Sequence, residues 1–247
     1  MLAAVSPDSR MYVRDAMFWA SRAMLALEED IACALRCDLN VMVSGERGVG
    51  KTAVARRIHF ESRRGRGPLV ISRTDDTAGA LHPAALNAPS GATILVHDPD
   101  RLSPSMQCRL LTLIERGTMR PARTVRLGAA NHGLRFITTT RSDLLELVRC
   151  ERFDESLFYR LNPIHLVIPP LRVRPEDIPL LLCHFMLQFA GTAPRLSPAA
   201  WDALVKYEWP GNVCELKAVA ARLASVERRM LQPSDLPPEI QASLTGR

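Results

Sequence analysis

The chain has 247 residues, of which 47% are hydrophobic and 23% are charged, so it can bury one large domain, or a large domain with a small satellite. It contains no apolar run of about 18 residues and no recognisable secretory signal, so we expect neither a membrane span nor export. Arginine supplies most of the positive charge, and the formal net charge is +6. This excess indicates an anionic partner, or reflects only a general preference for arginine in the composition.

The first two thirds of the sequence alternate between helical and strand patterns. Apolar residues recur at helical spacing over 22–36, and a short apolar run at 40–45 then ends in glycine. This alternation predicts a parallel sheet with helices on both faces. Further strands are expected at 68–72, 92–96, 134–140 and 165–170, and further helices at 51–64 and 104–117.

After Pro170 the pattern becomes purely helical, which predicts a small all-helical subdomain. Ser197 and Asn212 stand where helix N-caps are expected. The three amphipathic stretches cover 175–190, 197–208 and 212–230.

The six cysteines are scattered, without a Cys-x-x-Cys pair or a histidine pair that would complete a zinc site. We therefore expect reduced thiols and a cytoplasmic protein.

The string GERGVGKT, at 45–52, has the spacing of a phosphate-binding loop between a strand and a helix. Its glycines let the backbone N–H groups approach phosphate oxygens, Lys51 neutralises the β and γ phosphates, and the Thr52 hydroxyl could ligate magnesium. Nucleotide binding, with ATP or ADP as the ligand, is therefore the firmest functional prediction. The predicted phosphate-binding residues are Gly45, Glu46, Arg47, Gly48, Val49, Gly50, Lys51 and Thr52.

Two later strings are more specific. FDESLFYRLNPIHLVIPPLRVRPEDIPLLLCHF occupies 153–185, and YEWPGNVCELKAV occupies 207–219. Together with the loop they resemble the AAA+ domain of the bacterial sigma-54-dependent transcriptional activators. The resemblance implies an α/β AAA+ fold followed by a helical lid, ring assembly with nucleotide between subunits, and ATP hydrolysis that remodels sigma-54 RNA polymerase. It predicts an N-terminal extension (1–17), an α/β nucleotide-binding subdomain (18–172) and a helical lid subdomain (173–247).

The sequence departs from this family at the residues that bind magnesium and polarise the attacking water. The family strand ends in Asp-Glu, and the aligned residues here are His97 and Asp98. A neutral imidazole is a poor magnesium ligand, and aspartate is one methylene shorter than glutamate. Because successive strand residues face opposite ways, Asp98 could take over the metal only through a local distortion. Magnesium is therefore a doubtful cofactor.

Other positions that the resemblance assigns to hydrolysis also differ. The γ-phosphate-sensing asparagine is replaced by Arg141, and the asparagine that restrains the catalytic glutamate is replaced by Arg73. The family has two arginines that reach a neighbouring subunit's site; here Asp154 replaces the first, and the second remains as Arg160. Cys214 replaces the arginine of the lid. Asp98 and Arg160 are thus the weak catalytic candidates, although Arg73 or Arg141 could instead substitute for the lost charges.

The GAFTGA loop, which contacts sigma-54 in active members of the family, does not occur in the sequence. The segment 68–91, where the family carries it, is short. We therefore expect a nucleotide-binding regulator with impaired hydrolysis and no sigma-54 remodelling. The alternatives are a slow but genuine ATPase and a non-catalytic subunit that modulates an active homologue. The expected partners are a second copy, a related AAA+ subunit or the transcription machinery. We do not expect DNA contact by this chain alone, since no helix-turn-helix follows the lid.

Overall fold

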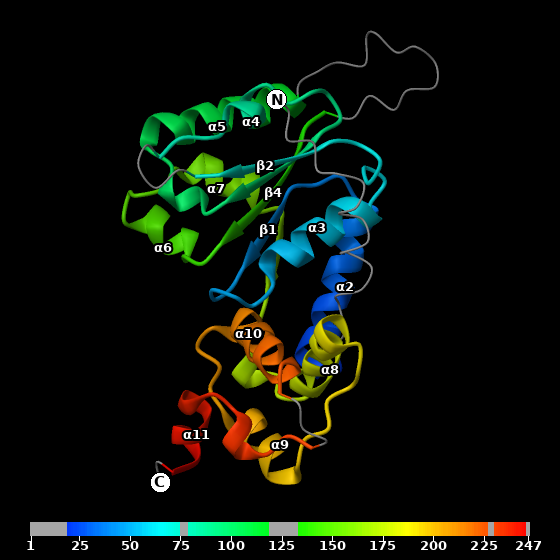
Figure 1. Ribbon diagram of the computed structural model, residues 1–247. Helices are drawn as coiled ribbons and strands as arrows, with labels where there is room; N and C mark the ends of the chain where they lie inside the picture. The colour runs from blue at the N-terminus through cyan, green and yellow to red at the C-terminus, as the bar shows by residue number, and fades with distance from the viewer. Residues whose placement is uncertain (1–18, 75–78, 119–132, 227–229, 246–247) are drawn as a thin grey trace. The chain divides into compact units, whose positions relative to one another are not determined.

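The computed structural model describes residues 19–74, 79–118, 133–226 and 230–245 (Figure 1). The chain forms two compact units, which are described separately. Unit 1 contains Glu29–Gly45 and Lys51–Val167, and unit 2 contains Ala16–Glu28, Glu46–Gly50 and Ile168–Arg247. The loop Glu46–Gly50 therefore groups with unit 2, although both of its flanks belong to unit 1.

Unit 1 is built on a parallel five-stranded sheet in the order β2-β3-β4-β1-β5. This arrangement confirms the predicted α/β fold class. Every residue of β4 is buried, as are four of the five residues of β3, because parallel sheets are covered on both faces. The strands are β1 (Val41–Ser44), β2 (Leu69–Arg73), β3 (Thr93–His97), β4 (Arg135–Thr140) and β5 (Ile164–Val167).

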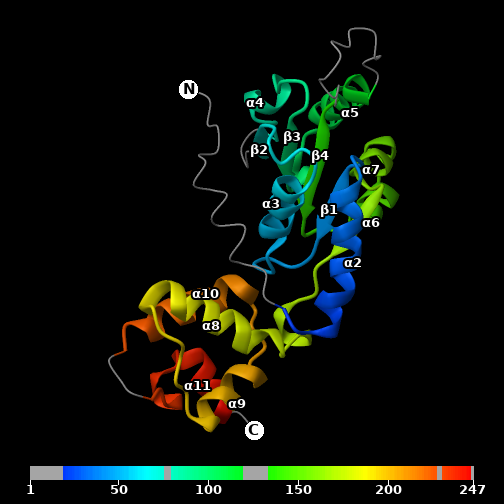
Figure 2. The ribbon, with the colours of Figure 1, turned by 90° about the vertical axis from the view of Figure 1, so that its right-hand side faces the viewer.

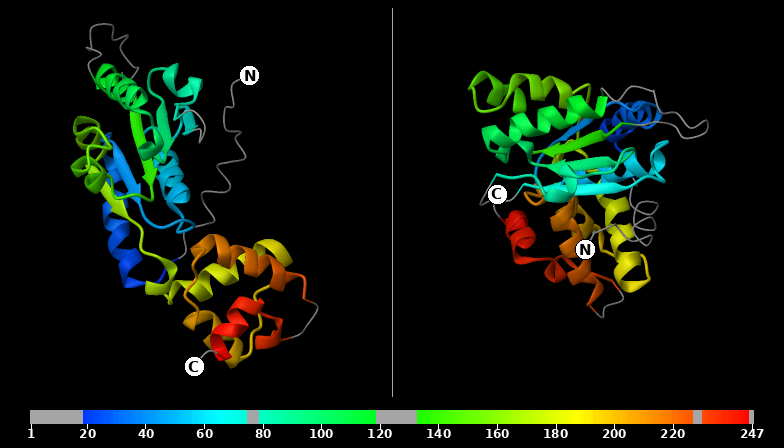
Figure 3. Two further views of the ribbon diagram at one scale, coloured as in Figure 1. Left: turned by 90° about the vertical axis from the view of Figure 1, so that its left-hand side faces the viewer. Right: turned by 90° about the horizontal axis from the view of Figure 1, so that it is seen from above.

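Helices cover the two faces of this sheet. The helix α3 lies on one side of β1 and β4, and α6 and α7 lie on the other (Figure 2 and Figure 3). The short α6 and α7 were not among the sequence predictions. The helices of unit 1 are α3 (Lys51–Glu61), α4 (Pro83–Leu86), α5 (Pro104–Thr118), α6 (Leu144–Arg149) and α7 (Glu155–Leu161), with a 3-10 turn η2 (Pro99–Arg101). The helix α2 (Arg22–Arg36) is divided between the units, since its residues up to Glu28 group with unit 2.

Unit 2 is helical after Ile168 and has its own apolar core, in which Trp209 is completely buried. The prediction that Ser197 caps a helix is confirmed, because its hydroxyl accepts a hydrogen bond from Ala200 N. The corresponding prediction for Asn212 is wrong, since Gly211 holds the cap position. The elements are η3 (Leu171–Val173), α8 (Asp177–Ala190), α9 (Pro198–Lys206), α10 (Asn212–Ala224), η4 (Pro233–Asp235) and α11 (Pro238–Thr245).

Within the described residues, no helix combines the length and the apolar character needed to cross a bilayer.

Candidate nucleotide site

The loop between β1 and α3 has the backbone conformation of a phosphate cradle. Gly48 and Gly50 have φ angles of 81° and 108°, in the region that side-chain-bearing residues avoid. A Cβ atom on Gly48 would also collide with the carbonyl oxygen of Gly211. Both glycines are therefore required by the path of the chain.

Lys51 and Thr52 open α3, so they lie at its positive end. The Lys51 ammonium donates a 2.7 Å hydrogen bond to the carbonyl oxygen of Gly45 at the start of the loop. Backbone N–H groups at a helix start, a positive helix end and an ammonium group together suit an anion. The residues present thus fit the phosphates of a nucleotide.

Unit 2 holds the loop through both backbone and side chains. Arg172 donates to both carboxylate oxygens of Glu46, at 2.8 and 2.6 Å. Asn212 Nδ2 donates to Glu46 and to the Arg47 carbonyl oxygen, at 3.2 and 3.0 Å. Buried Arg174 donates to the Val49 carbonyl oxygen at 3.0 Å. Glu46 therefore positions the loop, with its carboxylate already engaged.

Sequence reasoning did not find these supporting residues. Arg172 and Asn212 stand in the strings PPLR and WPGN, which carried the family resemblance but were given no contact to the loop. Asn212 Oδ1 also accepts a 2.7 Å hydrogen bond from Leu171 N. The asparagine amide thus joins η3 to the loop, and this explains why it does not cap α10.

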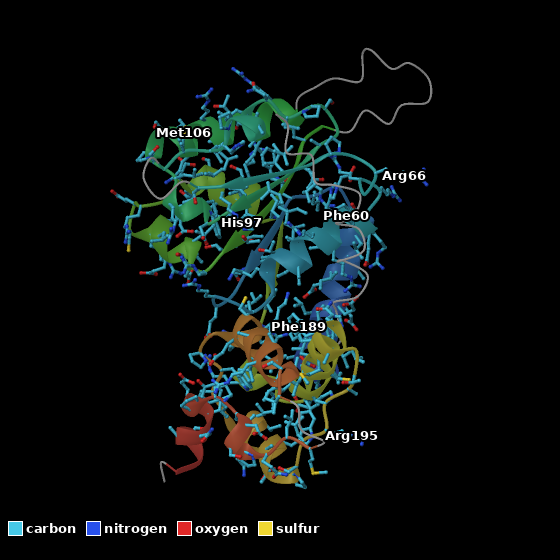
Figure 4. The ribbon with its side chains drawn as sticks, in the orientation of Figure 1. Phe60, Arg66, His97, Met106, Phe189 and Arg195 are labelled. Atoms are coloured by element: carbon cyan, nitrogen blue, oxygen red, sulfur yellow. The ribbon has the colours of Figure 1, made fainter. Side chains whose placement is uncertain are left out.

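His97 lies at the carboxyl end of β3, inside unit 1 (Figure 4). The strand register places it between Arg73 of β2 and Thr139 of β4. Its Nδ1 is 2.7 Å from the Thr139 hydroxyl. Burial, and after it the positive charges of Arg73, Arg56 and Lys51, together lower the pKa of His97 to about 4. The imidazole is therefore neutral at pH 7.

Asp98 does not continue the alternation of β3. Its φ and ψ of 47° and 62° are left-handed, and its N–H donates to the Thr139 carbonyl oxygen at 2.7 Å. Its carboxylate lies 3.8 Å from Arg141 Nε. Burial raises the pKa of Asp98, while Arg141 and Lys51 oppose that shift. The local distortion that Asp98 needs to leave the alternation of β3 is thus present, and the charge of Lys51 acts on both Asp98 and His97.

The side chains at the carboxyl ends of β3 and β4 do not fit a magnesium ion. Magnesium takes oxygen ligands in octahedral geometry. Besides the Thr52 hydroxyl at the start of α3, the available groups are the neutral His97 imidazole and the Asp98 carboxylate, which is paired with Arg141. Asp100 accepts hydrogen bonds from the hydroxyls of Thr140 and Ser142. Among the described residues, no three His, Cys, Asp or Glu side chains are grouped for metal binding.

The remaining candidates lie on α7, at its N-cap and on α10. Arg160 is on α7, its side chain is 53% exposed, and it lies 3.7 Å from Glu115. Asp154 caps α7 by accepting a 2.7 Å hydrogen bond from Leu157 N. Cys214 is exposed, and its backbone N–H donates to the Gly48 carbonyl oxygen. The Asp154 carboxylate therefore has a local structural role, whereas Arg160 is available at the surface.

Comparison with known proteins agrees with this architecture. Residues 18–171 match the Sigma-54 interaction domain, and residues 172–247 match an AAA+ ATPase lid domain. The regulatory protein AtoC of Escherichia coli K12 is 32% identical over 248 aligned residues, covering 90% of this chain and 53% of AtoC. The transcriptional regulatory protein ZraR of Klebsiella oxytoca is 34% identical over 230 residues, covering 82% of this chain and 50% of ZraR.

The fold also matches solved structures. NtrX from Brucella abortus, crystallised with ATP, superimposes with a TM-score of 0.76 at 24% identity, covering 96% of this chain and 60% of NtrX. The chain spans about half the length of the curated relatives it matches. With matches to both the α/β part and the lid, the chain belongs to the Sigma-54 interaction domain family of AAA+ proteins found in transcriptional regulators.

Proposed function

We propose that this chain is a nucleotide-binding regulatory module that holds ATP or ADP at residues 45–52 and hydrolyses ATP weakly or not at all. The observation that carries the proposal is the glycine cradle that ends in Lys51 and Thr52 at the start of α3. NtrX, which shares the fold, has been crystallised with ATP and with ADP. This supports a nucleotide as the anion.

Weak hydrolysis is proposed from the side chains at the positions that the family resemblance assigns to catalysis. Phosphoryl transfer depends on metal and cationic groups that stabilise the developing charge, and a single arginine finger can contribute about a thousandfold or more. Here the neutral His97 stands where the resemblance places the metal ligand, and Asp154 and Cys214 stand where it places two arginines. Each change removes stabilisation from the transition state more than from bound nucleotide.

Titration calorimetry with ATP and with ADP tests nucleotide binding. Lys51→Ala should weaken binding by about 10- to 100-fold, because a charge-assisted contact to phosphate contributes about 1.5–3 kcal/mol. Lys206→Ala is the matched control, since Lys206 is exposed on α9 and pairs with Asp202. Equal affinities of the two variants would contradict the proposal.

A slow ATPase is the second candidate, and the conformation of Asp98 favours it. The left-handed turn brings a carboxylate close to Arg141 and within electrostatic reach of Lys51. Phosphate release by the wild-type chain that disappears in Asp98→Asn would establish this activity. Equal background release from both proteins would remove this candidate.

We further propose that the module does not remodel sigma-54. The connection between β2 and β3 runs from Thr74 to Ala92, and its sequence contains no GAFTGA string. A pull-down of sigma-54 with the ATP-loaded chain should therefore recover none, with a family member that carries GAFTGA as the positive comparison. Nucleotide-dependent recovery of sigma-54 would overturn this part.

Association with another subunit is proposed from Arg160. Its guanidinium is more than half exposed on α7, where it could reach a neighbouring site. Gel filtration with and without ATP, alone and mixed with an active relative, should show a larger species that Arg160→Gln diminishes. A monomer under every condition would contradict this assignment.

A further inference from the structure

Positively charged side chains act on the carboxyl end of β3, where position 97 lacks a metal-binding carboxylate. Lys51, Arg56 and Arg73 all act electrostatically on His97. Lys51 also acts on Asp98, to which Arg141 lies close at 3.8 Å. Four cationic side chains, from α3, β2 and the loop after β4, therefore act on one small region of unit 1.

The positions of these arginines follow from the backbone. Arg73 is paired in register with His97, and paired residues of neighbouring strands project from the same face of a sheet. Arg56 lies on α3, five residues after Lys51, and α3 covers the face of β1 and β4 shown in Figure 2. The buried Arg56 Nε has no hydrogen-bond partner in the described part of the chain. Such a donor is costly to bury unless it meets an acceptor.

Among the described residues of this region, the cations exceed the carboxylates. Lys51 and three arginines stand against Asp98 and Asp100, and Asp100 already accepts two hydroxyl hydrogen bonds. Arginine presents several N–H donors in a planar array that matches phosphate oxygens, and it stays charged at any physiological pH. The excess is therefore suited to a polyanion.

We propose that this site binds nucleotide polyphosphate without a divalent cation, with Arg56, Arg73 and Arg141 supplying the positive charge that magnesium supplies in related sites. The inference rests on the proposed nucleotide-binding function and deepens it. It links two features of the site: the side chains at the carboxyl ends of β3 and β4 do not fit magnesium, and arginine occupies both positions where the family resemblance predicts a neutral asparagine. Guanidinium groups in place of the metal would preserve the affinity for phosphates.

Calorimetry with ATP in excess EDTA, and again in excess Mg²⁺, tests metal independence directly. The two dissociation constants should agree within about threefold, a difference of less than about 1 kcal/mol. Affinity that rises tenfold or more with Mg²⁺ would overturn the inference while leaving nucleotide binding intact. Binding under neither condition would defeat the proposed function itself, so the two failures are distinguishable.

Arginine variants test which side chains supply the positive charge that binds ATP. The double variant Arg73→Gln/Arg141→Gln should lose at least about tenfold in ATP affinity in EDTA, since two charge-assisted contacts are removed. Arg109→Gln is the matched control, because Arg109 is exposed on α5. Circular dichroism would verify that each variant folds. Wild-type affinity in the folded double variant would overturn the assignment of these arginines.

Discussion

The loop Glu46–Gly50 and the carboxyl ends of β3 and β4 differ in what holds them. The loop is fixed by contacts from Arg172, Arg174 and Asn212, which lie in the strings typical of the family. The strand ends carry the departures, namely His97 and the Arg141 that faces Asp98. On the proposed function, the loop would therefore keep its hold on a nucleotide although the residues that the family resemblance assigns to cleavage have changed.

Replacing Arg174 should give the largest effect on the loop side of this comparison. Arg174→Met leaves the Val49 carbonyl oxygen without its donor and removes a cation 3.9 Å from buried Asp177. We expect unit 2 to lose about 2–4 kcal/mol in its free energy of unfolding. Urea unfolding followed by tryptophan fluorescence reports unit 2 alone, because all three tryptophans belong to it.

Arg172→Met is the matched control for that experiment. Arg172 also contacts the loop, through Glu46, but its side chain is 38% exposed and solvent screens the pair. Its loss should be clearly smaller. Equal losses in the two variants would show that burial of Arg174 does not determine how firmly the loop is held.

At the strand ends, His97 should make the free energy of unfolding depend on pH. His97 stays neutral in the folded protein down to about pH 4, whereas in the unfolded chain it binds a proton near pH 6.5. The unfolded state thus binds more protons between these values, so this contribution is complete above pH 6.5 and falls towards pH 4. Between pH 7.5 and 4.5, we expect wild type to lose about 2 kcal/mol more than His97→Gln.

Urea unfolding followed by circular dichroism at both pH values gives this difference. The charged groups that act on His97 are Arg73, Arg56 and Lys51, which keep their charge across this range, so they do not add a step of their own. Parallel losses in wild type and variant would contradict a buried, neutral His97.

Local patterns predicted the sheet and the cradle because strand periodicity and loop glycines are set by nearby residues. They failed at Asn212, where an N-cap was expected. Its side chain instead joins Leu171 to the loop, over 41 and 165 residues of sequence. Such contacts depend on the packing of distant segments. For the same reason, alternation along β3 could not show that the strand ends at His97.

The smallest expected effect concerns the backbone of Asp98. Asp98→Asn and Asp98→Ala both remove the carboxylate and its pairing with Arg141, but asparagine tolerates the left-handed region better than alanine. The alanine variant should therefore be less stable than the asparagine variant by about 1 kcal/mol in urea unfolding followed by circular dichroism. Equal stabilities would mean that position 98 is not held left-handed. The carboxylate would then follow the alternation of β3 and turn away from Lys51, and the slow-ATPase candidate would lose its geometric support.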